Sequence, residues 1–188
     1  MTNLSGDRSH PRLPFASRAE AGRLLAERLL QLHLPQPITV IALPRGGVPV
    51  AAVVARALHA PLDLMLVRKI GAPGQPELAM AAVAEGTPPQ FVIEEGVWEA
   101  FRDQVDDIDS RTLDALREIA RRRQAYLHGR APLDLAGHTV IVVDDGIATG
   151  TTMRAALKAL RQRNPVQLVL AVPVAARDSM AMLRPEVD

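Results

Sequence analysis

Short apolar runs alternate with amphipathic stretches along most of the chain. Apolar runs rich in β-branched residues predict buried strands, whereas apolar positions spaced three and four residues apart predict helices with one buried face. The predicted strands are 38–43, 62–67, 139–143 and 166–172, with weaker candidates at 79–84 and 91–93. The predicted helices, besides one near the N-terminus, are 48–58, 151–163 and 175–183. This order predicts an α/β fold with a parallel sheet and right-handed crossovers.

The N-terminal helix is predicted from its first turn. Ser17 and Glu20 have the spacing of a capping box, in which the Ser17 hydroxyl accepts from the Glu20 amide and Glu20 reaches back. We expect a single domain over residues 1–188, in which residues 1–16 form a mobile leader. The N-terminal helix and the insertion 88–135 are expected to form a small hood over the sheet.

Two polar segments are predicted to lie on the surface. Residues 98–129 predict a long helix whose acids come first and whose bases come last, an order that complements the helix dipole. Segment 71–76 is predicted to be an irregular loop because it holds two Gly and two Pro residues. The aspartates of the helix are interpreted as solvated surface rather than as a metal cluster, and they are Asp103, Asp106, Asp107, Asp109 and Asp114.

Residues 140–152 carry the strongest chemical signal in the sequence. Four apolar residues predict a strand that ends in Asp144 and Asp145, and a turn rich in Gly and Thr then opens a helix. Open α/β sheets bind ligands at the carboxyl ends of their strands. A helix N-terminus offers unpaired N–H groups to a phosphate, and two carboxylates can accept hydrogen bonds from a ribose diol. The segment therefore predicts a site for a sugar phosphate.

Other motifs fit this segment less well. A P-loop requires Lys after its last Gly, where this chain has Thr151, and a dinucleotide fingerprint requires three Gly, where only Gly146 and Gly150 are present. A response-regulator receiver has an acidic pair at a strand end, but that pair follows the first strand of its fold. An ordinary strand–turn–helix explains the Thr residues but not the two carboxylates.

The segment resembles the phosphoribosyl pyrophosphate motif of type I phosphoribosyltransferases. That motif consists of an apolar strand, two Asp residues, three variable residues, Gly, and Thr or Ser. The resemblance implies that Asp144 and Asp145 bind the ribose hydroxyls and that the following turn binds the 5-phosphate. The implied phosphate-binding residues are Ala148, Thr149, Gly150, Thr151 and Thr152.

An earlier segment resembles the pyrophosphate loop of the same family. Residues 43–49 follow a predicted strand and contain Arg45, Gly46 and Gly47. The two Gly residues let backbone amides approach an anion closely, and Arg45 adds a fixed charge. The resemblance also implies that the loop carries a strained or cis peptide bond.

A third segment resembles the flexible loop that closes over the substrate in these enzymes. It begins with Lys69, placed at the end of predicted strand 62–67, and continues through the loop 70–78. Residues 67–77 also resemble a bacterial phosphoribosyltransferase subfamily whose acceptor is undefined. By this resemblance Arg45 and Lys69 are the expected catalytic residues, because both would neutralise the departing pyrophosphate and Lys69 would bind it together with Gly46 and Gly47.

Composition and charge narrow the class of protein. Hydrophobic residues make up 48% of the chain and aromatic residues 3%, which suits a core of aliphatic strands and helices. A net charge of +1 favours neither a nucleic-acid nor a membrane partner. The lack of Cys fits a cytoplasmic protein without disulfides, and no apolar run is long enough for a signal peptide or a membrane span.

The resemblance implies displacement of pyrophosphate from phosphoribosyl pyrophosphate by an unidentified nitrogenous acceptor. Mg²⁺ would be bound mainly through the substrate, so no protein metal site is expected, and a homodimer is left open. The alternative is a non-catalytic sensor of a phosphoribosyl ligand with the same fold. A phosphohydrolase is less favoured because the sequence offers neither dedicated metal ligands nor a nucleophile.

Two departures from the family pattern bear on the acceptor. Ala148 stands where enzymes that act on 6-oxopurines carry Asp, which argues against hypoxanthine and guanine. The resembling proteins also continue beyond the position of Asp188 into a further strand and a tail. If the chain ends at Asp188, we expect the sheet edge and part of the acceptor pocket to be incomplete.

Overall fold

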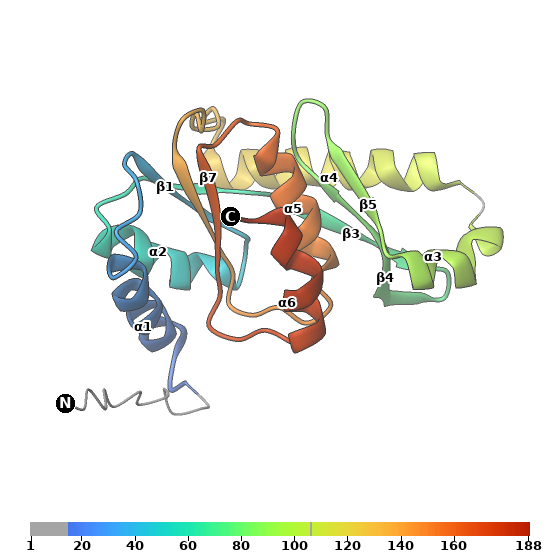
Figure 1. Cartoon of the computed structure of the whole chain (residues 1–188). Coiled ribbons are helices and arrows are strands. Elements are labelled where there is room, and N and C mark those ends of the chain that lie inside the picture. Colours follow the sequence, from blue (N-terminus) through green and yellow to red (C-terminus); the bar gives the residue numbers. More distant parts are fainter. Residues whose placement is uncertain (1–14, 106) are drawn as a thin grey trace.

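A parallel sheet of four strands lies at the centre of the structure (Figure 1). This computed structural model describes residues 15–105 and 107–188. All neighbouring strands are parallel. Their carboxyl ends therefore meet at one edge, where open α/β sheets bind ligands. In spatial order, the strands are β2 (Leu62–Leu64), β1 (Ile38–Ala42), β6 (Thr139–Val143) and β7 (Gln167–Ala171).

The two central strands, β1 and β6, are buried along their whole length. Their continuous apolar runs predict this, because strands covered on both faces have no polar side to show to water. Ile38 lies opposite Thr139, and Ala42 lies opposite Val143. The two strands therefore end side by side, so the segments that follow them lie next to each other at the carboxyl edge of the sheet.

Helices cover both faces of the parallel sheet. α1 and α2 pack on one face and approach each other closely at Gly22, where a Cβ atom would lie 2.9 Å from the Cβ of Val53. α5 packs on the opposite face. These helices are α1 (Arg18–Leu30), α2 (Gly47–Ala57) and α5 (Thr151–Arg161).

A smaller antiparallel sheet lies on the far side of α5 (Figure 1). Small side chains let α5 fit between the two sheets, since Ala155, Ala156 and Ala159 are all buried there. α3 and α4 cover the outer face of the small sheet. These elements are β3 (Val67–Ala72), β4 (Gln75–Ala84), β5 (Gln90–Ile93), α3 (Glu95–Phe101) and α4 (Ile108–Leu127). The chain then ends with α6 (Arg177–Leu183) and a short 3₁₀ turn, Arg184–Glu186.

The predicted strand 62–67 is wrong in its extent, because it joins the whole of β2 to the first residue of β3. The Met65 amide still donates to the Ala42 carbonyl of the parallel sheet over 3.0 Å. The Leu66 amide instead donates to the Glu85 carboxylate, and the Leu66 carbonyl accepts from the Glu85 amide. The chain thus leaves the parallel sheet between these two residues and enters β3.

The prediction of an irregular loop at 71–76 is also wrong, since these residues form the tip of a β-hairpin between β3 and β4. Ala72 pairs with Gln75 across a two-residue turn, in which Gly74 has a φ angle of +70°. Pro followed by Gly at the two central positions favours a type II turn. The prediction took into account only the number of Gly and Pro residues, whereas it is their order that specifies a tight turn.

The predicted helix 98–129 is divided into two helices. α3 ends at Phe101, a 3₁₀ turn follows, and α4 begins at Ile108. The Asp107 carboxylate caps α4 by accepting from the Ser110 amide over 2.9 Å, which explains why a new helix starts there. Asp106 lies outside the described residues.

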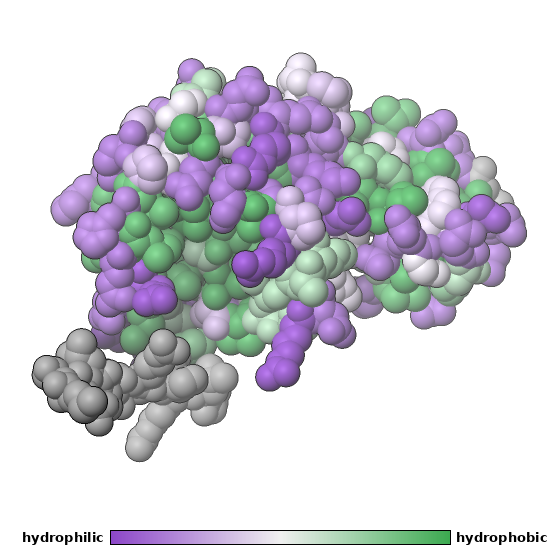
Figure 2. Space-filling model, viewed as in Figure 1, coloured by the Kyte–Doolittle hydropathy of each residue, from purple (hydrophilic) through white to green (hydrophobic). Residues whose placement is uncertain are grey.

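The predicted capping box of α1 is present at its start. The Glu20 amide donates to the Ser17 hydroxyl over 3.1 Å, and the Glu20 carboxylate accepts from the Ala16 amide. The predicted leader lies outside the described residues apart from positions 15 and 16. Apolar surface is visible along edge strand β7 in Figure 2, where Val169 and Leu170 are half-buried. Among the described residues, none of the helices combines the length and apolarity that a membrane crossing requires.

Candidate functional site

Two loops from neighbouring strands meet at the carboxyl edge of the parallel sheet. The loop after β1 contains Gly46 and Gly47, and the loop after β6 begins with Asp144 and Asp145. A Cβ atom at Gly46 would overlap the Asp145 carboxylate, and one at Gly47 would lie 2.8 Å from the Asp144 Cα. Glycine at 47 therefore lets the loop backbones approach, whereas a side chain at 46 would displace the Asp145 carboxylate. The structure brings together two motifs that are about a hundred residues apart in the sequence.

The two carboxylates lie in different surroundings. Asp144 is more deeply placed, and its Oδ1 accepts from the Asp145 amide over 2.8 Å. Burial raises the pKa of Asp144 to about 6; the hydrogen bond from the Asp145 amide opposes this shift, and the Asp145 charge adds to it. The pair therefore holds a proton more tightly than two exposed carboxylates would.

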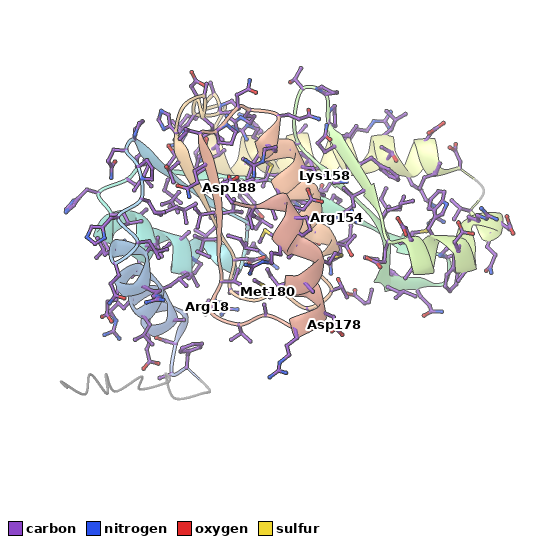
Figure 3. The ribbon with its side chains drawn as sticks, viewed as in Figure 1. Arg18, Arg154, Lys158, Asp178, Met180 and Asp188 are labelled. Atoms are coloured by element: carbon purple, nitrogen blue, oxygen red, sulfur yellow. The ribbon has the colours of Figure 1, made fainter. Side chains whose placement is uncertain are left out.

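Arg18, the first residue of α1, forms an ion pair with Asp145. Its Nε and Nη2 atoms lie 2.9 Å and 2.7 Å from the same carboxylate oxygen, Oδ2. Figure 3 shows Arg18 at the end of α1 that lies nearest the carboxyl edge of the sheet. The side chain of Arg18 is 59% exposed and that of Asp145 is 31% exposed, so both remain open to a ligand.

The turn between β6 and α5 is held by the C-terminal segment. Gly150, the N-cap of α5, has a φ angle of +81°, and a Cβ atom there would lie 2.6 Å from the Cε of Met182 in α6. Ser179 of α6 donates to the Ala148 carbonyl. The first N–H groups of α5 have no acceptor within the helix, so this fixed turn presents them at the site.

The Thr residues of this turn have different partners. Thr151 is buried, and its hydroxyl donates to Glu94 over 2.8 Å, which links the turn to the start of α3. The Thr152 Oγ1 atom is buried without a hydrogen-bond partner in the described part of the chain. Thr149 is exposed. The Thr151 side chain is therefore engaged within the protein, whereas its backbone amide belongs to the open end of α5.

Arg45 and Lys69 are both exposed, but Arg45 lies in the loop after β1 at this edge, whereas Lys69 lies in β3 of the small sheet. The peptide bond between Pro44 and Arg45 is cis, as the resemblance implied, and Arg45 is exposed. Lys69 is exposed within β3, not at the end of a strand of the parallel sheet. It pairs with Ala82, whose side chain belongs to the core around α5, so the strand pairing places Lys69 on the α5 side of β3.

Two cavities border the loops at opposite ends of the carboxyl edge. One of about 500 Å³ lies beside Arg45 and is completed by Leu64 of β2 and Tyr126 of α4. The other, of about 320 Å³, lies beside Asp145 and includes Arg18. A third cavity of about 450 Å³, between α4 and the C-terminal end of α5, shares no residue with the site.

Sequence reasoning missed three residues of this site: Arg18, Glu94 and Ser179. Each contacts a predicted site residue from a segment distant in sequence; Arg18 is 127 positions from Asp145, for example. No local pattern signals such contacts. The capping box next to Arg18 identified the start of α1 but not the direction in which that helix end points.

The sequence profile of the phosphoribosyl transferase domain matches residues 16–184. The chain belongs to this family. Two curated relatives from strains of Mycobacterium tuberculosis, both named "Putative phosphoribosyl transferase", are 42% identical over 174 residues. The match covers 89% of this chain and 37% of each relative, so the chain spans little more than a third of their length.

Solved structures of two other bacterial proteins are similar to this chain. The structure of TT1426 from Thermus thermophilus is 40% identical, with a TM-score of 0.73, and the match covers 93% of this chain and 81% of that one. The AQ2163 protein of Aquifex aeolicus is 13% identical, with a TM-score of 0.52, over 90% of this chain and 69% of that one. The second likeness shows the fold alone.

Proposed function

We propose that this protein transfers the 5-phosphoribosyl group from phosphoribosyl pyrophosphate to a nitrogenous acceptor and releases pyrophosphate. The observation that supports this most is the contact of Gly46 and Gly47 with Asp145 and Asp144. Phosphoribosyl pyrophosphate carries its pyrophosphate and its ribose hydroxyls on adjacent carbon atoms. A ligand of that shape could engage both loops at once.

The loop after β6 would bind the sugar-phosphate half of this ligand. Asp144 and Asp145 would accept hydrogen bonds from the ribose hydroxyls, which donate well to carboxylates. The amides of residues 149–152 would bind the 5-phosphate at the positive end of the α5 dipole. The hydroxyl of the exposed Thr149 would donate as well, whereas that of Thr151 already donates to Glu94.

The loop after β1 and strand β3 would act on the pyrophosphate half. The Gly46 and Gly47 amides and the charges of Arg45 and Lys69 would stabilise the negative charge that develops on the leaving group. An interaction that strengthens as charge develops favours the transition state over the ground state. The turn of the β3–β4 hairpin would exclude water, which could otherwise attack C1 of the ribose.

The donor set at this edge fits a Mg²⁺ ion that is carried by the substrate. Mg²⁺ prefers oxygen ligands and keeps several waters, so one or two carboxylates together with phosphate oxygens suffice. Asp144 and Asp145 supply such carboxylates, and no group of three or more metal-binding side chains was found within residues 15–105 and 107–188. The bound ion would neutralise part of the pyrophosphate charge.

Pyrophosphate release from phosphoribosyl pyrophosphate, measured with Mg²⁺ across a panel of nitrogenous bases, tests this function. We expect release that depends on one class of base and that slows about tenfold or more in Arg45→Gln, since a charged contact is worth roughly 1.5–3 kcal/mol. Arg56→Gln, at the exposed far end of α2, is the matched control and should retain the wild-type rate. Tight binding of phosphoribosyl pyrophosphate without release by any base would instead support a sensor.

A further inference from the structure

The cavity of about 450 Å³ lies at the opposite end of α5 from the candidate site. α5 begins at Thr151 in the candidate site, whereas Ala159, near its C-terminal end, lines the cavity. An α-helix rises about 1.5 Å per residue, so the 11 residues of α5 separate its two ends by about 16 Å. The cavity and the candidate site are therefore two separate places on the molecule.

Three charged side chains from three segments line this cavity. Glu85 follows β4, Arg123 belongs to α4, and Arg163 follows α5. Arg123 Nη1 lies 2.9 Å from both carboxylate oxygens of Glu85, and the two side chains are only 19% and 17% exposed. Arg163 instead donates to the Leu133 carbonyl and forms no ion pair within the described residues. The cavity thus contains one neutralised arginine and one arginine whose charge is not matched.

The two guanidinium groups would both be stabilised by an anion in the cavity. Arg123 Nη2 is buried and has no hydrogen-bond partner in the described part of the chain. An unpaired buried donor is unfavourable, because it has given up its hydrogen bonds to water. Burial also lowers the pKa of Arg163; the nearby Asp63 and Glu85 charges oppose this shift, and the Arg123 charge adds to it. A bound anion would supply the acceptor that Arg123 lacks and the negative charge that Arg163 lacks.

Apolar side chains form much of the remaining wall. They include Met65, Leu116, Ile119 and Pro132. We propose that this cavity binds a small organic carboxylate, whose carboxylate group contacts Arg123 and Arg163 and whose apolar body packs against these side chains. The proposal concerns a second site and does not depend on the proposed phosphoribosyl transfer.

The charge of the lining favours a carboxylate over a phosphate ester. Two arginines and one glutamate give the cavity lining a net charge of +1. A carboxylate neutralises that charge, whereas a phosphate monoester carries about −1.5 to −2 at neutral pH and would leave negative charge in excess. Asp63 lies near Arg163 but does not line the cavity, and its charge is paired with that of Arg130. The planar carboxylate also matches the planar fork of a guanidinium group.

Such a ligand should stabilise the folded chain. It would contact the end of β4, α4 and the segment after α5, which lie around one cavity only in the folded state. A ligand that binds only the folded state raises the stability of that state according to its concentration. The unfolding temperature should therefore rise with the concentration of a carboxylate that binds here.

Ligand-observed NMR with matched probes tests the proposal. Phenylacetate and hexanoate each join one carboxylate to an apolar body. Phenylacetamide and hexanamide have nearly the same shapes without the charge, and phenyl phosphate replaces the carboxylate by a phosphate. Each probe is titrated at millimolar concentration into the full chain, and thermal unfolding in the presence of the same probes gives a second measurement.

Three variants change the cavity in different ways. Arg123→Lys keeps a positive charge beside Glu85 but loses the Nη2 donor. Arg163→Gln removes the unmatched charge. Ala120→Leu enlarges an exposed side chain of α4 and narrows the cavity without altering any of its charged residues. Because this last position is exposed, the variant is expected to fold even if a change at either arginine disturbs the structure.

Two matched controls make the same kinds of change outside the cavity. Arg117→Lys lies on the exposed surface of α4, where the side chain is 78% exposed. Ala100→Leu enlarges an exposed alanine of α3. Neither residue lines the cavity. Circular dichroism establishes that each variant and each control is folded.

We expect at least one carboxylate to bind the wild-type chain and its amide to bind about tenfold more weakly or not at all. Carboxylate affinity should fall about tenfold in Arg123→Lys and in Arg163→Gln, the scale of one lost charged contact, and should be lost in Ala120→Leu. Both controls should bind like the wild-type chain. Failure of both carboxylates to bind, or equal affinities in the wild-type chain and the folded cavity variants, would overturn the site. Phenyl phosphate bound more tightly than phenylacetate would overturn the choice of a carboxylate.

Discussion

Asp144 connects the chemistry of the site with the stability of the fold. Its carboxylate is placed at the end of a fully buried strand, and burial raises its pKa from 3.8 to about 6. A group whose pKa is higher in the folded state than in the unfolded state binds its proton more tightly when folded. The folded state is therefore favoured when Asp144 is protonated, and this stabilisation is lost as the pH rises from about 4 to about 6.

Replacing Asp144 by Asn should remove this pH-dependent cost. We expect Asp144→Asn to unfold at a higher temperature than the wild-type chain at pH 7.5, with the difference shrinking between pH 6 and pH 4. An amide oxygen can still accept from the Asp145 amide, so the local hydrogen bond is kept. Thermal unfolding followed by circular dichroism measures the difference. A variant that is less stable than wild type at pH 7.5 would show that the ionised carboxylate is stabilised by contacts beyond this hydrogen bond.

In the proposed function, Lys69 would act on the pyrophosphate half of the ligand. Our expectation from the sequence placed it at the end of a strand in the parallel sheet, but it lies within β3 of the small sheet, on the α5 side. We predict that Lys69→Ala weakens phosphoribosyl pyrophosphate binding about tenfold to a hundredfold, the worth of one well-placed charged contact. Ribose 5-phosphate affinity should stay nearly the same, because that ligand lacks the pyrophosphate. Calorimetry with both ligands measures this, and equal losses would assign Lys69 to the pocket as a whole.

At the scale of the elements, the site depends on the close approach of two strand-to-helix loops. Gly46 lies against the Asp145 carboxylate, and Gly47 lies against the Asp144 backbone. The Gly46 backbone has ordinary helical angles, with φ at −62° and ψ at −37°, so any side chain could adopt them. A side chain there would meet the Asp145 carboxylate of the neighbouring loop, whereas the backbone conformation itself does not favour glycine.

The Gly46→Ala variant isolates this contact. The added methyl group would displace the Asp145 carboxylate without straining the Gly46 backbone. We expect ribose 5-phosphate affinity to fall about tenfold, the scale of one lost charge-assisted hydrogen bond. Gly96→Ala in α3, where a Cβ atom meets nothing within 4 Å, is the matched control and should bind normally. Unchanged affinity in Gly46→Ala, measured by calorimetry, would mean that Asp145 does not hold the ribose.

The elements that could be predicted from the sequence are those with a local cause. The buried strands β1 and β6 follow from continuous apolar runs, and the start of α1 follows from its capping box. The β3–β4 hairpin was missed because its Pro73–Gly74 turn was interpreted as a break in structure. The second sheet as a whole was not predicted. Its strands pair with one another because the chain leaves the parallel sheet after β2, and no local pattern marked that point.

At the scale of the whole molecule, the site is assembled from segments that only the tertiary fold brings together. The sequence predicted that each loop follows a strand, and the parallel pairing of β1 with β6 brings the two loops to one edge. The ion pair of Arg18 with Asp145 and the hydrogen bond of Thr151 with Glu94 were not predictable, because each joins elements of different layers. Such contacts depend on how whole helices and sheets pack, which no local pattern records.

The most direct test of this account is the affinity of phosphoribosyl pyrophosphate for the wild-type chain and for the double variant Asp144→Asn, Asp145→Asn. Calorimetry in the presence of Mg²⁺ should show binding by the wild-type chain and a loss of about a hundredfold or more in the variant, because two charge-assisted hydrogen bonds are removed. Circular dichroism should show that the variant is folded. A folded double variant that binds phosphoribosyl pyrophosphate as tightly as the wild-type chain would contradict the ribose-binding role of these carboxylates.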